Sequence, residues 1–282
     1  MKKITPKAMC AWIPKREDET HKGDYGRVLI VAGNKQFGGA AIMAAEACVK
    51  SGAGLTTVAS DSVNRPALQT RIPECMFIDY ENITSLSDQI SQFDTILIGP
   101  GLGLDAHAEE IFSLVLEKST EHQQIIIDGD GITIYAKGEI SHPASKLTFT
   151  PHLGEWERLK VLAPNAETML DAAIALDATI VLKGHRTKVY SGETVWQNMY
   201  GTPAMATGGM GDTLAGTICG LMAQTEKPIT GTLAAVFLHS YIGEILAKKR
   251  YVVLPTEIAE ELPTYLKIFS ETDEHAKKNP PR

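Results

Sequence analysis

The sequence predicts an α/β fold in which a mostly parallel sheet is covered by helices on both faces. Short apolar runs without polar alternation, such as Arg27–Ala32, are typical of strands buried on both sides. Helical patterns alternate with these runs, which is the order expected of repeated strand–helix–strand units. Hydrophobic residues make up 44% of the 282 residues, enough for the large core that such a fold requires.

The predicted strands follow one another, most with a clear stop signal. Arg27–Ala32 ends at Gly33, and most later apolar runs end in turns rich in glycine, proline or aspartate. These later runs are 55–59, 93–98, 124–127, 147–150 and 178–182. Two further β segments, 188–190 and 194–196, flank Ser191-Gly192 and predict a hairpin.

Helices are predicted between these strands and throughout the C-terminal region. The alanine-rich stretch 39–51 predicts a helix packed closely on the sheet, and helical patterns recur over 105–116 and 166–176. From Asp212 onward the chain is nearly all helical, with 229–248 the longest segment. Because no linker or repeat interrupts the pattern, we expect one domain over 1–271 and a disordered tail over 272–282.

Composition argues against several classes of function. Lys and Arg number 27 against 34 Asp and Glu, and the formal charge of −7 argues against general nucleic-acid binding. No apolar run approaches the ~18 residues of a membrane span, and the N-terminus lacks a secretory signal. The four cysteines, Cys10, Cys48, Cys75 and Cys219, show no metal-ligand spacing. We therefore expect a cytoplasmic protein with reduced thiols.

The segment Thr207–Leu214 carries the clearest sign of chemistry. Gly208, Gly209 and Gly211 precede an apolar helix, whose first N–H groups are available to an anion. The carboxylate of Asp212 is unfavourable beside a phosphate unless it acts as a base or manages a metal ion. Taken alone, the segment equally permits a plain turn in which Asp212 caps the helix.

Five other unusual loops follow predicted strands, and they are 34–40, 99–103, 128–131, 151–155 and 183–187. Open parallel sheets bind ligands at the carboxyl ends of their strands, so we expect these loops to converge with the glycine turn. The glycines of Gly99–Gly103 would let a flat ligand approach the backbone, although a tight turn is the alternative. Their spacing is not a complete dinucleotide fingerprint, and the chain has no Walker-type loop.

Polar residues in three of these loops are candidate ligand contacts. We favour a substrate hydrogen bond for His152, against the alternative that Glu155 caps a helix and His152 is exposed. The basic loop Lys183–Thr187 is either a nucleotide-phosphate contact or a solvated turn. Asp128 and Asp130 either help to hold Mg²⁺ through water or form a strand-end turn.

Taken together, the motifs resemble the ADP/ATP-dependent NAD(P)H-hydrate dehydratases of the ribokinase-like superfamily. The matching segments are His21–Gly26, Gly38–Ala41, Gly99–Gly103, Pro151–Glu155, Lys183–Thr187 and Gly208–Asp212. The last of these marks the superfamily, whereas Lys22–Gly26 and Pro151–Glu155 are more specific to the dehydratases. The resemblance implies a three-layer α/β/α sandwich. Since the first motif begins at His21, we expect no preceding epimerase domain.

The implied reaction repairs nicotinamide cofactor. The substrate would be the 6-hydroxy hydrate of NADH or NADPH, the co-substrate ADP or ATP, and the metal ion Mg²⁺. Phosphorylation would turn a poorly leaving hydroxyl into a phosphate ester, and elimination of phosphate would restore NAD(P)H. The resemblance also implies a homo-oligomer, often a tetramer.

The same resemblance assigns residues to roles. Asp212 matches the catalytic base, and the backbone of Gly209, Met210 and Gly211 matches an anion hole for the phosphoryl group. The positions that match substrate contacts are Ala40, Gly103, His152 and Asp212. The positions that match nucleotide contacts are Lys183, Gly184, His185, Arg186, Thr187 and Gly211. The pattern does not fix the metal ligands.

Two other functions stay open on the sequence. A small-molecule kinase of the same superfamily would share Gly208–Asp212 but would release a stable phosphorylated vitamin precursor. A nucleotide sensor would keep the site without turnover. Neither the choice of ADP or ATP nor that of NADH hydrate or NADPH hydrate follows from the motifs.

Overall fold

The computed structural model describes residues 1–138 and 141–271, so the predicted tail over 272–282 lies outside the described residues. Within them, ten strands form one sheet in the order β1-β10-β9-β8-β7-β6-β5-β2-β3-β4. The strands are β1 Lys2–Lys3, β2 Arg27–Val31, β3 Leu55–Ser60, β4 Met76–Asp79, β5 Thr95–Ile98, β6 Gln124–Ile127, β7 Lys146–Phe149, β8 Ala178–Leu182, β9 Lys188–Ser191 and β10 Thr194–Gln197. From β4 to β8 every neighbouring pair is parallel, and β9 is antiparallel to both of its neighbours. The predicted mostly parallel sheet is confirmed.

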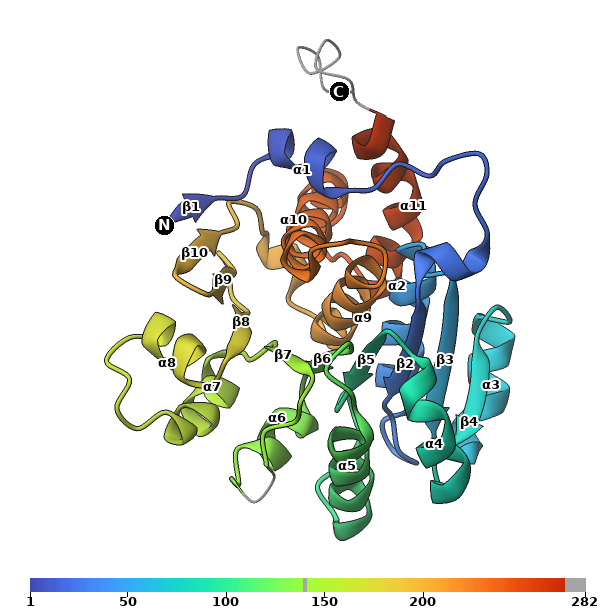
Figure 1. The fold of residues 1–282 in the computed structure, drawn as a ribbon. Coiled ribbons are helices and arrows are strands. Elements are labelled where there is room, and N and C mark those ends of the chain that lie inside the picture. The colour runs from blue at the N-terminus through green and yellow to red at the C-terminus, as the bar shows by residue number, and fades with distance from the viewer. Residues whose placement is uncertain (139–140, 272–282) are drawn as a thin grey trace.

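Helices cover both faces of this sheet (Figure 1). They are α1 Pro6–Trp12, α2 Gly38–Lys50, α3 Arg65–Arg71, α4 Ile83–Gln89, α5 Ala106–Lys118, α6 Asp130–Tyr135, α7 Leu153–Leu159, α8 Met169–Ala175, α9 Met210–Met222, α10 Pro228–Ala247 and α11 Pro255–Glu271. One core joins Val28 and Ile30 to α1–α3 and α9–α11, and the other joins Leu29 and Val31 to α4–α8. Successive side chains of β2 thus enter opposite cores, as the alternation of a strand requires, and the fold has three layers.

Two differences from the predicted elements have local causes. Helix α8 begins at Met169 rather than at residue 166 because the Thr168 side chain accepts the N–H of Asp171, and the Asp171 carboxylate accepts the N–H of Thr168. Strand β4 was not predicted because it lies at the edge of the sheet. There Met76 is exposed and Phe77 half-buried, so the continuous apolar run of a central strand is missing.

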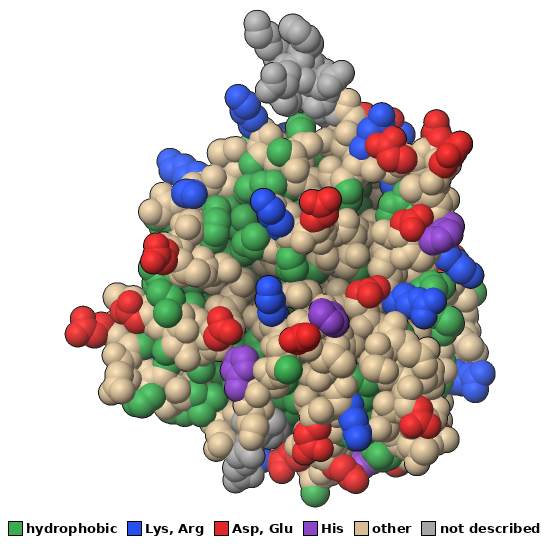
Figure 2. Space-filling model, viewed as in Figure 1, with side chains coloured by type: hydrophobic (Ala, Val, Ile, Leu, Met, Phe, Trp, Pro, Cys, Tyr) green, Lys and Arg blue, Asp and Glu red, His purple; other side chains and the backbone are tan. Residues whose placement is uncertain are grey.

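Helix α10 is long and apolar enough to cross a membrane, contrary to the expectation from the sequence. Its mean hydropathy reaches 1.4, but 67% of that stretch is buried inside the protein. Phe237 stacks on Tyr241 within the helix, and α10 packs against α9 and α11. It is therefore a core helix. The face drawn in Figure 2 carries interspersed acidic and basic side chains without a continuous basic surface.

Helices α2 and α9 approach each other unusually closely. A Cβ added to Gly216 would lie 2.1 Å from the carbonyl oxygen of Ala44, and one added to Gly220 would lie 2.7 Å from that of Cys48. Cys48 and Cys219 are buried in this interface as free thiols, as predicted. The glycines of α9 therefore let its backbone rest on α2, and this contact fixes how α9 lies against the rest of the protein.

Replacing Gly216 should destabilise the protein through this contact. Gly216→Ala forces a methyl group against the α2 backbone and should lower the free energy of unfolding by about 1–3 kcal/mol, measured by chemical denaturation. Gly39→Ala is the matched control, because its Cβ meets nothing within 4 Å; it should change stability by no more than about 0.5 kcal/mol. Equal stability of the two variants would contradict the tight α2–α9 contact.

Candidate active site

The register of the sheet brings the ends of its central strands to one level. Val31 of β2 pairs with Ile98 of β5, Ile98 with Ile127 of β6, and Ile127 with Phe149 of β7. Beyond β8, the N–H of Lys183 donates to the carbonyl of Pro151, which extends the alignment. The loops that begin at this edge are 32–37, 99–105, 128–129, 150–152 and 183–187. The loops that were predicted to converge therefore start from the same edge.

The glycine turn ends in the first turn of α9. Gly209 is the N-cap, with φ 90°, and this backbone conformation requires glycine; a Cβ there would also displace the end of the Met43 side chain. Met210, Gly211 and Asp212 form the first helical turn, where N–H groups have no partner within the helix. Asp212 is the third helical residue, so the alternative in which it caps the helix is wrong.

Lys183 is the positive centre of the site. Its Nζ lies 2.7 Å from Asp128 Oδ1 and 3.6 Å from Glu155 Oε2. Thr150 Oγ1 donates to the same Asp128 oxygen at 2.7 Å. Burial lowers the pKa of Lys183, but Asp128 and Glu155 outweigh this effect and leave the pKa raised, so the ammonium stays charged. A Cβ on Gly211 would lie 3.3 Å from Nζ, which places this charge beside the first turn of α9.

Asp212 is half-buried beside this ion-paired cluster. Burial raises the pKa of Asp212 to about 7, assisted by the negative charge of Asp128 and opposed by Lys183. Asp130 and Glu155 raise the pKa further. A carboxylate that is partly ionised near neutral pH has the affinity for protons that a general base needs.

His152 and Glu155 form a reciprocal cap at the start of α7. His152 Nδ1 accepts the N–H groups of Gly154 and Glu155 at 2.9 and 3.3 Å, and Glu155 Oε2 accepts the N–H of His152 at 2.7 Å. The alternative in which Glu155 caps the helix is confirmed, yet Glu155 also contacts Lys183. The His152 side chain is 58% exposed, and its Nε2 lies 3.6 Å from Glu155 Oε1.

Gly103 connects the charged cluster to the loop after β2. Its N–H donates to Asp130 Oδ2 at 2.9 Å. A Cβ on Gly103, whose φ is 99°, would lie 3.0 Å from Asn34 Nδ2. Nearby, a Cβ on Gly101 would lie 3.0 Å from the Cβ of Ala40 in the first turn of α2. Ala40 and Gly103 thus lie where the loop after β5 approaches the start of α2 and the loop before it.

Beyond Lys183, the basic loop leaves the cluster. Thr187 is buried, and its Oγ1 donates to the carbonyl of Gly184 at 3.1 Å. Arg186 Nη1 donates to the carbonyl of Met199. The exposed residues of the loop are Gly184, His185 and Arg186. The structure thus brings Lys183 among the carboxylates and leaves the rest of the loop outside that cluster.

The described residues hold no group of three His, Cys, Asp or Glu side chains placed to bind a metal ion. Asp128 is paired with Lys183, and Asp130 accepts the N–H of Gly103. These carboxylates therefore do not build an all-protein metal site. Mg²⁺ is usually held by one or two carboxylates together with water and substrate phosphates, which is the arrangement that this donor set fits.

The sequence as a whole matches a known family. The family model described as NAD(P)H-hydrate dehydratase matches residues 28–264. The chain belongs to this family. An ADP-dependent (S)-NAD(P)H-hydrate dehydratase of Listeria monocytogenes is 94% identical over 276 residues, covering 98% of this chain and 100% of the relative. The enzyme of the same name from Enterococcus faecalis is 47% identical over 264 residues, covering 92% and 90%.

Solved structures of similar proteins share the fold. A ribokinase-like superfamily protein of Enterococcus faecalis matches with a TM-score of 0.92 and 44% identity, over 96% of this chain and 97% of that one. An ADP/ATP-dependent NAD(P)H-hydrate dehydratase of Bacillus subtilis, crystallised with ATP and Mg²⁺, matches with a TM-score of 0.84 and 29% identity, over 95% and 98%. The predicted ribokinase-like architecture is confirmed.

One residue beside the glycine turn of this dehydratase-family chain was missed in the sequence. His239 of α10 is buried, and burial lowers its pKa to about 4 against the opposing effect of a hydrogen bond to the backbone of Met210. A neutral imidazole therefore lies against the first turn of α9. Its only signal in the sequence was an isolated histidine in an apolar helix, which is more often a plain core residue.

The raised pKa of Asp212 should make stability depend on pH. With respect to this group the free energy of unfolding is highest below the unfolded value of 3.8 and falls as the pH rises to about 7, because the folded carboxyl keeps a proton that the unfolded chain releases. Asp212→Asn removes this loss of stability at higher pH. Above neutral pH the variant should be more stable by on the order of 2 kcal/mol, a figure that allows for partial screening by solvent.

Chemical denaturation across this pH range measures the effect. The advantage of Asp212→Asn should shrink as the pH falls toward 3.8. Asp88→Asn replaces an exposed carboxylate on α4 and serves as the control, with little effect at any pH. An advantage of Asp212→Asn that does not change with pH would contradict the raised pKa.

Proposed function

We propose that this chain dehydrates the 6-hydroxy hydrate of NADH or NADPH, with ADP or ATP as the phosphoryl donor. Membership of the NAD(P)H-hydrate dehydratase family and 94% identity to an ADP-dependent relative support this reaction. The structural observation that carries it is the position of Asp212. A carboxylate with a pKa of about 7 lies on the first turn of α9, beside the Lys183 ammonium.

The first step transfers a phosphoryl group to the substrate. Asp212 takes the proton of the C6 hydroxyl as the hydroxyl oxygen attacks the terminal phosphorus of the nucleotide. A new P–O bond forms, the bond to the leaving phosphate oxygen breaks, and ADP departs as AMP, or ATP as ADP. The N–H groups of Gly209, Met210 and Gly211 provide an anion hole for the transferring oxygens, strengthened by the positive end of the α9 dipole.

The second step eliminates phosphate and restores the cofactor. The C6–O bond breaks, phosphate leaves with the electron pair, and the neighbouring ring carbon C5 loses a proton. The C5=C6 double bond of the dihydronicotinamide then returns. The net loss is the elements of water, which makes the reaction that of a carbon–oxygen lyase.

The two ligands are proposed to lie on either side of Asp212. The nucleotide contacts Lys183, Gly184, His185, Arg186, Thr187 and Gly211, and the hydrate contacts Ala40, Gly103 and His152. Lys183 supports this assignment because its ammonium is already held at the start of α9 by Asp128 and Glu155. A phosphate placed there meets both a fixed cation and free helical N–H groups.

Mg²⁺ is proposed to arrive bound to the nucleotide phosphates, where it would neutralise their charge. Asp128 and Asp130, at the end of β6 and the start of α6, would reach it through water molecules. That a Bacillus subtilis relative was crystallised with ATP and Mg²⁺ supports the pairing of metal ion and nucleotide.

We also propose that residues 1–271 form one domain and that the protein is a cytoplasmic homo-oligomer, a tetramer by family resemblance. An exposed apolar segment between α10 and α11 supports an interface between subunits. Its exposed side chains are Tyr251, Val252 and Leu254. Clustered exposed apolar residues are typical of interaction surfaces.

Asp212→Asn should bind ADP but lose turnover by at least about a hundredfold, because an amide cannot take the hydroxyl proton. Turnover is measured as recovery of NADH absorbance from the purified hydrate with Mg²⁺ and either ADP or ATP. Calorimetry measures ADP binding, and Asp88→Asn is the active control.

Three results would change the assignment. An active Asp212→Asn variant would remove Asp212 from the role of base. No recovery by the unaltered protein with either nucleotide would overturn the proposed reaction. A phosphorylated product that accumulates, detected by mass spectrometry, would assign the chain to the small-molecule kinases.

The pH profile of turnover should report the charge of Lys183. In the unaltered protein kcat/KM should rise with pH as Asp212, whose pKa is about 7 before the nucleotide binds, loses its proton. Lys183 lowers the pKa of Asp212, so Lys183→Met should move this midpoint to higher pH. Lys183→Arg keeps the charge and should keep the midpoint. The same midpoint in both variants, measured at saturating ADP, would contradict the electrostatic coupling.

A further inference from the structure

A hollow opens at the same edge of the sheet as the candidate site, where the loops after β2, β3, β4 and β5 meet. Its volume is about 520 Å³, within the usual range of small-molecule sites. We call it the β2–β5 pocket. The lining residues that matter here are Asn34, Lys35, Asp61, Glu81, Leu102 and His107.

The pocket lies at the point where the order of the strands reverses. From β2 the chain moves outward to β3 and β4, and it then returns to the other side of β2 as β5. In open parallel sheets the crevice at such a point is where dinucleotides bind. The topology therefore favours a nucleotide ligand for this pocket, independently of any residue in it.

The pocket adjoins the charged cluster through Gly103. Asn34 lines the pocket, and its Nδ2 would lie 3.0 Å from a Cβ on Gly103. The N–H of Gly103 in turn donates to Asp130, one of the carboxylates that raise the pKa of Asp212. The hydrate is a dinucleotide, so with its nicotinamide ring at Asp212 its adenosine half needs a second place along this edge.

The walls of the pocket have the chemistry of a nucleoside site. Leu102 and Ile111 belong to its lining but are almost fully buried, whereas Asp61 and Glu81 supply carboxylates that accept sugar hydroxyl groups. His107 Nε2 has no hydrogen-bond partner, although Glu81 Oε2 is 3.4 Å away. Because this nitrogen is buried, a ligand would reach it only after the exposed Glu81 side chain moves aside.

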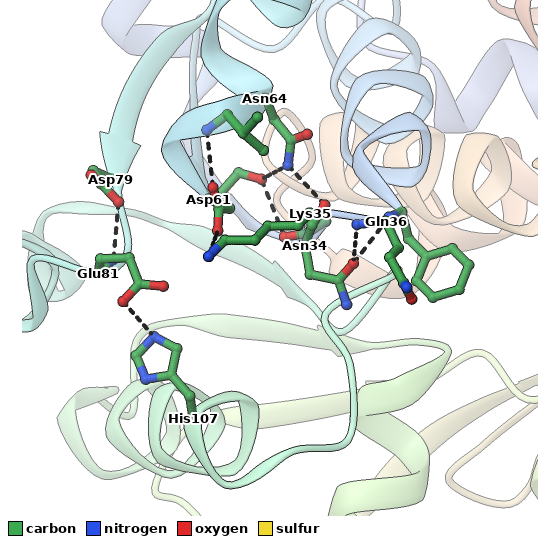
Figure 3. A network of polar contacts seen from close by, with 12 residues as sticks. Asn34, Lys35, Gln36, Asp61, Asn64, Asp79, Glu81 and His107 are labelled. Atoms are coloured by element: carbon green, nitrogen blue, oxygen red, sulfur yellow. Dashed lines mark hydrogen bonds and ion pairs between the residues drawn. The ribbon is translucent and has the colours of Figure 1, made fainter.

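The charges at the pocket come from opposite sides. Figure 3 shows Lys35 directed toward Asp61, with Nζ 3.9 Å from Oδ2, and Glu81 directed toward His107. The Lys35 and Glu81 side chains are 78% and 52% exposed, so each can turn toward a bound ligand. A 2′-phosphate would be attracted by Lys35 and repelled by Glu81.

We propose that the β2–β5 pocket binds the adenosine half of the nicotinamide dinucleotide hydrate, an inference that rests on the proposed function. Lys35 and Glu81 then set the balance between the two hydrates. The ammonium favours the NADPH hydrate with its 2′-phosphate, and the carboxylate favours the uncharged ribose of the NADH hydrate.

Two charge-neutralising variants with opposite expected effects test this assignment. The measured quantity is the ratio of kcat/KM for NADPH hydrate to that for NADH hydrate, with ADP saturating. Glu81→Gln should raise the ratio and Lys35→Gln should lower it, each by about three- to tenfold. The change should lie in KM rather than in kcat, because the adenosine half lies away from the reacting ring. Glu167→Gln, at a separate surface hollow beside α7 and α8, is the matched control and should leave the ratio unchanged.

The outcomes separate this inference from the proposed function. Turnover by the unaltered protein, together with an unchanged ratio in both variants, would overturn only the role of the pocket. Altered KM for ADP with unchanged KM for both hydrates would place the donor nucleotide there and would also overturn it. If the unaltered protein acts on neither hydrate, both the proposed function and this inference are overturned.

Discussion

The candidate site depends on the ion pairs that the Lys183 ammonium forms. It lies between Asp128 and Glu155 and beside the turn that carries Asp212, so one cation holds together a group of carboxylates that would otherwise repel one another. It also limits how far burial raises the pKa of Asp212. A fully unopposed burial would keep that carboxyl protonated and unable to accept a proton. The chemistry proposed for Asp212 thus rests on a charge contributed by the loop after a different strand.

Backbone packing determines whether this charge and the helix meet. Helix α9 reaches the sheet edge because Gly216 and Gly220 let it lie directly on α2, and Gly209 turns the chain into the helix with a φ of 90° that other residues rarely adopt. The strand ends are level because β2, β5, β6 and β7 pair in register. Two separate constraints, one between helices and one within the sheet, therefore bring Lys183 and α9 together.

The sequence predicted those features that residues close together along the chain determine. The central strands, the glycine turn and the position of Asp212 within it were visible because each has a short pattern of its own. The contact between Lys183 and Asp128 was not, since 55 positions separate the two and nothing local links them. His152 and Glu155 show a different limit. For the segment that holds these two residues, the sequence presents helix capping and a place in the site as alternatives. Glu155 does both, because it takes part in the α7 cap and also contacts Lys183.

Because Asp212 is half-protonated, ligand binding is also coupled to the uptake of protons from the solvent. Near neutral pH this carboxyl exchanges its proton readily, and a nucleotide anion placed against it raises its affinity for that proton. Association therefore draws hydrogen ions from the buffer. The heat released on binding then includes the ionisation enthalpy of whichever buffer supplies them, and the apparent affinity for the nucleotide increases as the medium becomes more acidic.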